Sequence, residues 1–349
     1  MATSDASVHR QRDRPSKSPT LRHFDVYGLT VRVGGEWAEV VEELALDFAW
    51  FGTAPTSAEP DVDISVERRE PDFGRYASAR ATFVTPRNVV YQEPGRTIVD
   101  YFGRGLAVLD RASGRLVLQG LESHLVHEAG YLFLLSRIGE HLDARGFARL
   151  HAVGLAGADG AVAVTLPSGG GKSTLARRAL DDTVKLLSDD SPILDRQGRV
   201  HPFPLRIGVN PTDAESLPQE HVRRIERMEF HPKLVLDVAA FADRIETQPQ
   251  PLRHLVIARR SLGCDATLEP APRRAAVMPL VRESVVGVGL FQGMEFVLQH
   301  GWRDVAGKLG VAAGRAACCS AAVRRAHVWI ATLGRDADRN WDCLRRLLA

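Results

Sequence analysis

The stretch VAVTLPSGGGKSTLARRAL, residues 162–180, limits the possible folds more than any other part of the chain. An apolar strand pattern runs directly into a glycine run, a Lys-Ser-Thr triplet and a series of helix-forming residues. Consecutive glycines let backbone N–H groups approach an anion closely, and the start of the following helix adds a favourable dipole. The order of strand, glycine loop and helix therefore predicts a phosphate-binding loop in an α/β domain.

This loop departs from the usual pattern G-x-x-x-x-G-K-[ST] at its first position. Counting back from Gly171, the pattern requires glycine at position 166, and this chain has Leu166. Position 166 directly follows the predicted strand, where an extended backbone accommodates a side chain. We expect Lys172 to reach the β- and γ-phosphates of ATP and the Ser173 hydroxyl to coordinate Mg²⁺. The residues predicted to bind the nucleotide are Ser168, Gly169, Gly170, Gly171, Lys172, Ser173 and Thr174.

A second motif, VKLLSDDSPIL at residues 184–194, follows one helix later. Its short apolar strand ends at a pair of carboxylates, Asp189 and Asp190. Ligands in open α/β sheets lie beyond the carboxyl ends of strands. We expect this strand to be a parallel neighbour of the strand before the loop, which would bring both carboxylates beside the phosphates. The alternative is an Asp-Ser-Pro turn with solvated carboxylates.

Two adjacent carboxylates beside phosphates suit phosphoryl transfer to a hydroxyl. One can hold Mg²⁺, directly or through water, while the other accepts the proton of the attacking hydroxyl. We assign Asp189 as the base and Asp190, with Ser173, as a metal ligand, although the sequence leaves the division between the two aspartates open. Arg206, in RVHPFPLRIGVN, is either a contact of the transferred phosphoryl group or a solvated edge residue.

With these motifs the second half resembles the catalytic domain of the HPr kinase/phosphorylase family, whose nucleotide site is similar to that of phosphoenolpyruvate carboxykinase. The resemblance covers residues 148–210 and includes LHAVGL with His151, LPSGGGKST and SDD. Family glycines or alanines are replaced by Ala152, Leu166 and Ser188. The resemblance implies an α/β P-loop kinase domain, ATP and Mg²⁺ as cofactors, a serine hydroxyl as acceptor, and His151 near the phosphates as an orienting or charge-balancing catalytic group.

The glycine- and arginine-rich loop of family members that act on HPr is not found in this chain. The chain looks more like HPr-kinase-related proteins of peptide natural-product gene clusters of the lasso-peptide type. That resemblance implies an acceptor serine in a ribosomally made precursor peptide or small protein. A small-molecule hydroxyl kinase and a nucleotide-binding regulatory protein without phosphoryl transfer stay as alternatives.

The sequence divides into a polar tail (1–22), a β-rich α+β domain (23–147) and the nucleotide-binding domain (148–349). Short alternating segments in the second part predict an antiparallel sheet, with helices at 36–51 and 122–146. The net charge of +2 gives no indication of a nucleic-acid partner, and no apolar run is long enough to span a membrane. The four cysteines form no CxxC pair, which suits a reducing, cytoplasmic setting. Whether the protein forms a homo-oligomer is left open by the sequence.

Overall fold

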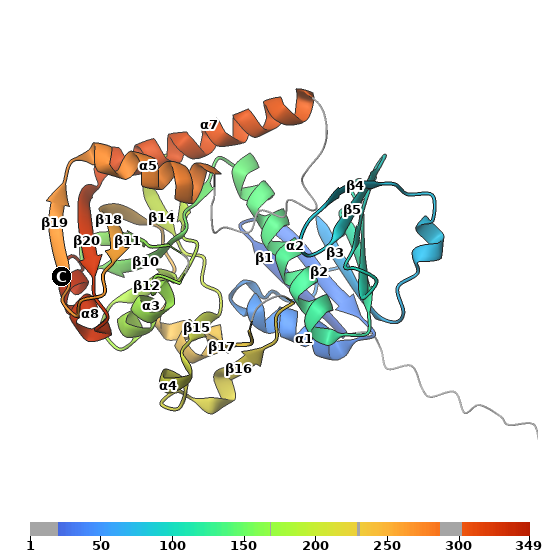
Figure 1. The fold of residues 1–349 in the computed structure, drawn as a ribbon, viewed down its shortest axis with the longest axis horizontal. Coiled ribbons are helices and arrows are strands. Elements are labelled where there is room, and N and C mark those ends of the chain that lie inside the picture. Colours follow the sequence, from blue (N-terminus) through green and yellow to red (C-terminus); the bar gives the residue numbers. More distant parts are fainter. Residues whose placement is uncertain (1–19, 168, 229–230, 287–301) are drawn as a thin grey trace, which may run out of the picture.

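The structure, a computed structural model, describes residues 20–167, 169–228, 231–286 and 302–349 of a mixed α/β chain (Figure 1). Its first half is an eight-stranded sheet with the order β1-β2-β3-β8-β7-β6-β5-β4. The strands are β1 (Thr20–Val26), β2 (Leu29–Gly35), β3 (Val62–Arg68), β4 (Ala81–Val84), β5 (Val89–Glu93), β6 (Arg96–Asp100), β7 (Gly105–Asp110) and β8 (Arg115–Gly120). Helices α1 (Ala38–Asp47) and α2 (Ser123–Ala144) pack on each other and on one face of this sheet.

The predicted antiparallel sheet is wrong in one respect, because β3 runs parallel to both β2 and β8. A parallel pair needs a long crossover, and α1 lies in the connection between β2 and β3. Both helices of this half form where the sequence predicted them. Strand β1 begins at Thr20, inside the stretch 1–22 that was predicted as a tail, and residues 1–19 lie outside the described part of the chain.

The second half contains a nine-stranded sheet with the order β12-β10-β11-β18-β14-β13-β9, in which β20 also pairs with β18 and β19 pairs with β20. The strands are β9 (Ala148–Arg149), β10 (Ala152–Gly157), β11 (Gly160–Thr165), β12 (Lys185–Ser188), β13 (Ile193–Leu194), β14 (Arg199–His201), β18 (Gln250–Arg260), β19 (Thr267–Ala271) and β20 (His327–Leu333). A separate three-stranded sheet has the order β15-β17-β16, with β15 (Ile207–Val209), β16 (Val222–Ile225) and β17 (Lys233–Leu236).

Helices cover both faces of the nine-stranded sheet. Along β11, Val162 and Val164 face a core shared with α3 and α8, while Ala161 and Ala163 face a core shared with α5 and α7. This alternation explains why the whole strand is apolar, since both of its faces are buried. The helices are α3 (Lys172–Leu180), α4 (Pro211–Ala214), α5 (Val277–Leu280), α7 (Trp302–Arg325) and α8 (Ala337–Arg345), with a π-helix at Val281–Val286 and short 3₁₀ turns elsewhere.

The neighbour predicted for the strand before the acidic pair is wrong. Strand β12 pairs antiparallel with β10, and β10 pairs antiparallel with β11, so β10 lies between the two. Because β10 opposes both neighbours, β12 and β11 still run in the same direction and end at the same edge of the sheet. The glycine loop and the acidic pair therefore emerge together, as expected, although their strands do not touch.

The two halves of the chain share one hydrophobic core. Ile193, Phe203 and Leu205, from the second half, belong to the same buried cluster as the helices of the first half. Helix α2 lies against the second half in Figure 1 and contacts β9 and α7. Among the described residues, no helix combines the length and apolar character that a bilayer crossing requires.

Candidate functional site

The glycine loop connects the end of β11 at Thr165 to the start of α3 at Lys172. Gly169 and Gly171 have φ angles of 74° and 100°, and a Cβ added at either would meet no atom within 4 Å. The positive φ angles favour glycine, and the open space leaves the backbone accessible to a ligand. A Cβ at Gly170 would lie 2.8 Å from the Pro167 carbonyl oxygen, so glycine is needed there for a different reason. Ser168, predicted to bind nucleotide, lies outside the described residues.

Leu166, which replaces the first glycine of the usual pattern, is compatible with the loop. Its side chain is buried in the core beneath the loop, between β11 and α3. Its carbonyl oxygen accepts a hydrogen bond from Lys172 Nζ at 3.2 Å. The backbone of residue 166 thus contacts the lysine while its side chain points into the core.

Lys172 is buried and lies in a chain of polar contacts. Its Nζ lies 2.7 Å from His151 Nε2, and His151 Nδ1 lies 2.7 Å from Glu283 Oε2. Burial lowers the pKa of His151, but its contacts with the carboxylates of Asp190 and Glu283 outweigh burial and raise that pKa above its ordinary value. The backbone of Glu283 also accepts a hydrogen bond from the backbone N–H of His151, at 3.0 Å. Glu283, in the π-helix, therefore contacts both the side chain and the backbone of His151.

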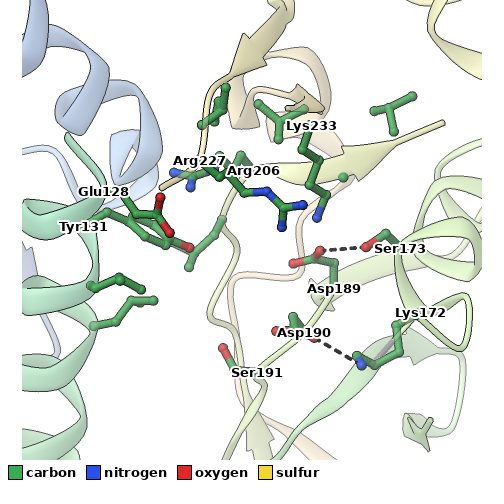
Figure 2. Close-up of a pocket in the computed structure, with 18 of the residues that line it drawn as sticks. Glu128, Tyr131, Lys172, Ser173, Asp189, Asp190, Ser191, Arg206, Arg227 and Lys233 are labelled. Atoms are coloured by element: carbon green, nitrogen blue, oxygen red, sulfur yellow. Dashed lines mark hydrogen bonds and ion pairs between the residues drawn. The ribbon is translucent and has the colours of Figure 1, made fainter. Parts of the chain in front are cut away.

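The acidic pair follows β12 in a tight turn in which the Ser191 backbone N–H donates to the Ser188 hydroxyl at 3.0 Å. Asp190 Oδ1 lies 3.3 Å from both Lys172 Nζ and His151 Nε2. The Ser173 hydroxyl is directed to Asp189 Oδ2 at 3.5 Å rather than to Asp190 (Figure 2). The predicted metal ligands Ser173 and Asp190 are thus close neighbours in the site, but each contacts a different partner.

The environments of the two carboxyl groups push their pKa values apart. Asp189 is buried, and burial together with the charge of Asp190 raises its pKa to about 7. The side chain of Asp190 is half exposed. Burial would raise its pKa too, but the hydrogen bond from His151 and the charge of Lys172 outweigh that effect and hold the pKa of Asp190 below its ordinary value. Adjacent carboxyl groups with separated pKa values are typical of catalytic sites.

These residues line a cavity of about 680 Å³ that three parts of the molecule enclose (Figure 2). The glycine loop and the acidic pair form one side, and the three-stranded sheet forms the second. Helix α2 of the first half forms the third side, through Glu128, Tyr131, Leu132 and Leu135. No sequence pattern indicated that the first half contributes to the site, because these side chains are typical of any amphipathic helix.

All the predicted site residues in the described part of the chain gather here, although Gly170 lies behind the loop surface rather than on the cavity wall. Glu283 and Lys233 belong to the site and were not predicted. Neither lies in a recognisable motif, so only the three-dimensional arrangement reveals them.

Arg206 also reaches the cavity wall, but its charge is already paired. It forms an ion pair with the fully buried Asp47 of α1, and its guanidinium carbon lies 3.9 Å from the centroid of the Tyr131 ring. Only 14% of its side chain is exposed, so it is not the solvated edge residue considered from the sequence. Its contacts join the first half to the second.

A scan against protein-family models finds no match for this chain, and neither does a search of curated proteins. The function is therefore inferred from the geometry of the site.

Proposed function

We propose that the protein is a kinase with a P-loop domain of the HPr kinase/phosphoenolpyruvate carboxykinase type, which transfers the γ-phosphoryl group of ATP to a serine-type hydroxyl. The observation that carries this proposal is the buried Lys172 at the start of α3, beside an open glycine loop and a carboxylate pair. Burying an ammonium group is costly unless it is paired. Here its partners are a carbonyl oxygen, an imidazole and a half-exposed carboxylate at the mouth of the cavity.

The loop fits the phosphates of ATP. Its backbone is unobstructed at Gly169 and Gly171, and the N-terminus of the nine-residue helix α3 supplies N–H groups and a positive dipole end. Lys172 adds a cation next to these groups. Together they provide a positively charged surface for an anion at the carboxyl edge of the sheet.

The donor set also fits Mg²⁺. This ion usually takes one or two carboxylates and a hydroxyl from the protein, with phosphate oxygens and water completing the shell. Ser173 would supply the hydroxyl, and Asp190, whose pKa is held below its ordinary value, would supply the carboxylate. When bound, Mg²⁺ neutralises charge on the phosphates.

Asp189 is the proposed general base. Its raised pKa places its protonation equilibrium near neutral pH, where a base is most effective. The acceptor hydroxyl loses its proton to the Asp189 carboxylate while its oxygen forms a bond to the γ-phosphorus. The bond from that phosphorus to the β,γ-bridging oxygen breaks, and the electron pair leaves with ADP. His151 holds Lys172 and Asp190 in place through its contact with Glu283.

Incubation with γ-labelled ATP and Mg²⁺ tests the proposal. Parallel reactions would contain serine-bearing peptides, small hydroxyl metabolites, or no added acceptor, with Asp189→Asn as the inactive control. We expect label on a serine peptide with the wild type only. Label on a metabolite would indicate the small-molecule kinase instead. Nucleotide binding without any labelled product would indicate a regulatory protein and contradict the proposal.

A further inference from the structure

Lys233, the first residue of β17, lines the same cavity as the glycine loop. Figure 2 shows its side chain extending from the three-stranded sheet toward Asp189 and Ser173. Unlike Lys172, it forms no hydrogen bond or ion pair with any part of the chain that the structure describes. The Lys233 ammonium thus faces the carboxylates of the cavity but does not pair with them. An additional anion could bind between this ammonium and those carboxylates.

The adjacent strand accommodates this side chain. Lys233 crosses β15 at Gly208, where an added Cβ would overlap the Cε and Nζ atoms of the lysine. The φ angle of Gly208 is not positive, so the backbone does not require glycine there. The missing side chain instead provides the space that lets Lys233 extend into the cavity.

We propose that Lys233 is a second phosphoryl-binding cation, which contacts the γ-phosphoryl oxygens from the side opposite Lys172. The inference rests on the proposed function. Asp189 and Lys233 face each other without forming an ion pair, whereas Lys172 pairs with Asp190 on the other side. A γ-phosphoryl group between these charges would have one lysine on each side and the base carboxylate next to it.

This arrangement matches the charge distribution of the reaction. During transfer, negative charge spreads over the equatorial oxygens of the phosphoryl group, and cations around that group stabilise it. Lys172 comes from the loop that binds the other phosphates, so it contributes to binding ATP and ADP alike. Lys233 comes from a different element, β17, and extends toward Asp189, the proposed base, so we expect its contact to depend on the γ-phosphoryl group.

Calorimetric titration of the full-length protein with MgADP and with the magnesium complex of AMP-PNP, a non-hydrolysable ATP analogue, tests this difference. Lys233→Ala should weaken AMP-PNP binding about tenfold or more, since one charge-assisted contact is lost, while MgADP affinity stays within about twofold. Lys233→Arg should restore most of the loss. Lys185→Ala, at an exposed lysine that begins β12, is the matched control and should change neither affinity.

Gly208→Ala provides an independent variant that leaves the lysine in the sequence. Its methyl group should displace Lys233 and weaken AMP-PNP binding in the wild type, but add nothing in the Lys233→Ala background. Equal AMP-PNP affinity in wild type and Lys233→Ala, or an equal loss of both nucleotides, would overturn the inference. A wild type that binds neither nucleotide would overturn the proposed function itself.

Discussion

Asp47 of α1 and Arg223 of β16 form an ion pair at 2.8 Å, although 176 residues separate them in the sequence. The Asp47 carboxylate is fully buried and also contacts His127 Nε2 at 2.8 Å and the guanidinium of Arg206. Arg223 is shared with Asp237, at 2.7 Å. This cluster attaches the helices of the first half to the three-stranded sheet that carries Lys233. One buried carboxylate therefore connects the wall formed by α2 to the sheet on the other side of the cavity.

Replacing Asp47 should destabilise the protein strongly. Asp47→Ala leaves two guanidinium groups without their buried carboxylate, and breaking such a cluster costs about 3–5 kcal/mol in the free energy of unfolding. Urea denaturation followed by circular dichroism measures the loss. Asp63→Ala is the control, because Asp63 pairs with Arg32 at a partly exposed position of the same half, and should cost about 1 kcal/mol or less. Similar losses in both variants would contradict a special role for Asp47.

Replacing Lys172 should remove most of the affinity for ATP. Its ammonium is pre-positioned by Leu166 and His151, so a phosphate gains a charge-assisted contact with little reorganisation. The contact is worth about 1.5–3 kcal/mol, or roughly 10- to 100-fold in the dissociation constant. Calorimetry with Mg·ATP compares Lys172→Ala with Lys185→Ala. Unchanged binding by Lys172→Ala would mean that the glycine loop does not bind phosphate.

The local motifs of the site could be read from the sequence, because each depends on neighbours in the chain. As predicted, α3 begins at Lys172 directly after the glycine run, and β12 ends at Ser188 directly before the acidic pair. His151 was identified through the resemblance, and it lies beside Lys172.

The contacts between distant segments could not be predicted. Glu283 lies 132 residues after His151, and no pattern near either residue indicates the other. The order of strands was mistaken because a hairpin places β10 between β12 and β11, whereas sequence spacing alone favours direct neighbours. The direction of strand β3 was mistaken because alternating apolar residues do not distinguish parallel from antiparallel pairing. The burial of Asp47 could not be predicted either, because its sequence neighbours are those of an ordinary helix carboxylate.

Asp189 should lower stability in the absence of metal and nucleotide. The pKa of an unfolded aspartate is about 3.9, and that of Asp189 is raised to about 7. Between these values the folded state keeps a proton that the unfolded state has lost, so this residue reduces stability as the pH rises from 4 to 7. In EDTA at pH 8, Asp189→Asn should be more stable than the wild type by about 4 kcal/mol in the free energy of unfolding, and the difference should vanish near pH 4.

Thermal unfolding across this pH range checks the result. Asp159→Asn, in the exposed turn between β10 and β11, should show no such trend. The same Asp189 variant should bind Mg·ATP and lose at least about 100-fold in turnover, since it has no proton acceptor. Turnover near the wild-type level would rule out Asp189 as the base.

Asp190→Asn should have a different effect, because the pKa of Asp190 is held below its ordinary value. As a metal ligand, it contributes a negative charge that amide oxygen does not replace. The Mg²⁺ concentration for half-maximal turnover should therefore rise, with part of the activity recovered at high Mg²⁺. Titrating Mg²⁺ at a fixed ATP concentration measures the shift. If excess Mg²⁺ restores Asp189→Asn instead, the roles of the two aspartates are exchanged.

The acceptor must reach the acidic pair past α2, which lines the cavity. Phosphoryl transfer requires the hydroxyl in line with the γ-phosphate and close to the base. Tyr131, Leu132 and Leu135 form the wall on that side. A serine in a flexible peptide can enter between this wall and Asp189 more easily than a serine on a folded surface. We therefore expect a serine-containing precursor peptide to be phosphorylated and HPr not to be.

Leu132→Arg should test this route without altering the nucleotide site. The added bulk and charge on the wall should reduce phosphorylation of the peptide by about tenfold or more, since 1.4 kcal/mol already corresponds to a factor of ten, while Mg·ATP affinity is retained. Leu121→Arg is the control, because Leu121 is 49% exposed and does not line the cavity. Assays that offer HPr and the peptide side by side decide the acceptor. Efficient phosphorylation of HPr, or an unaffected Leu132→Arg variant, would show that the acceptor approaches by a different path.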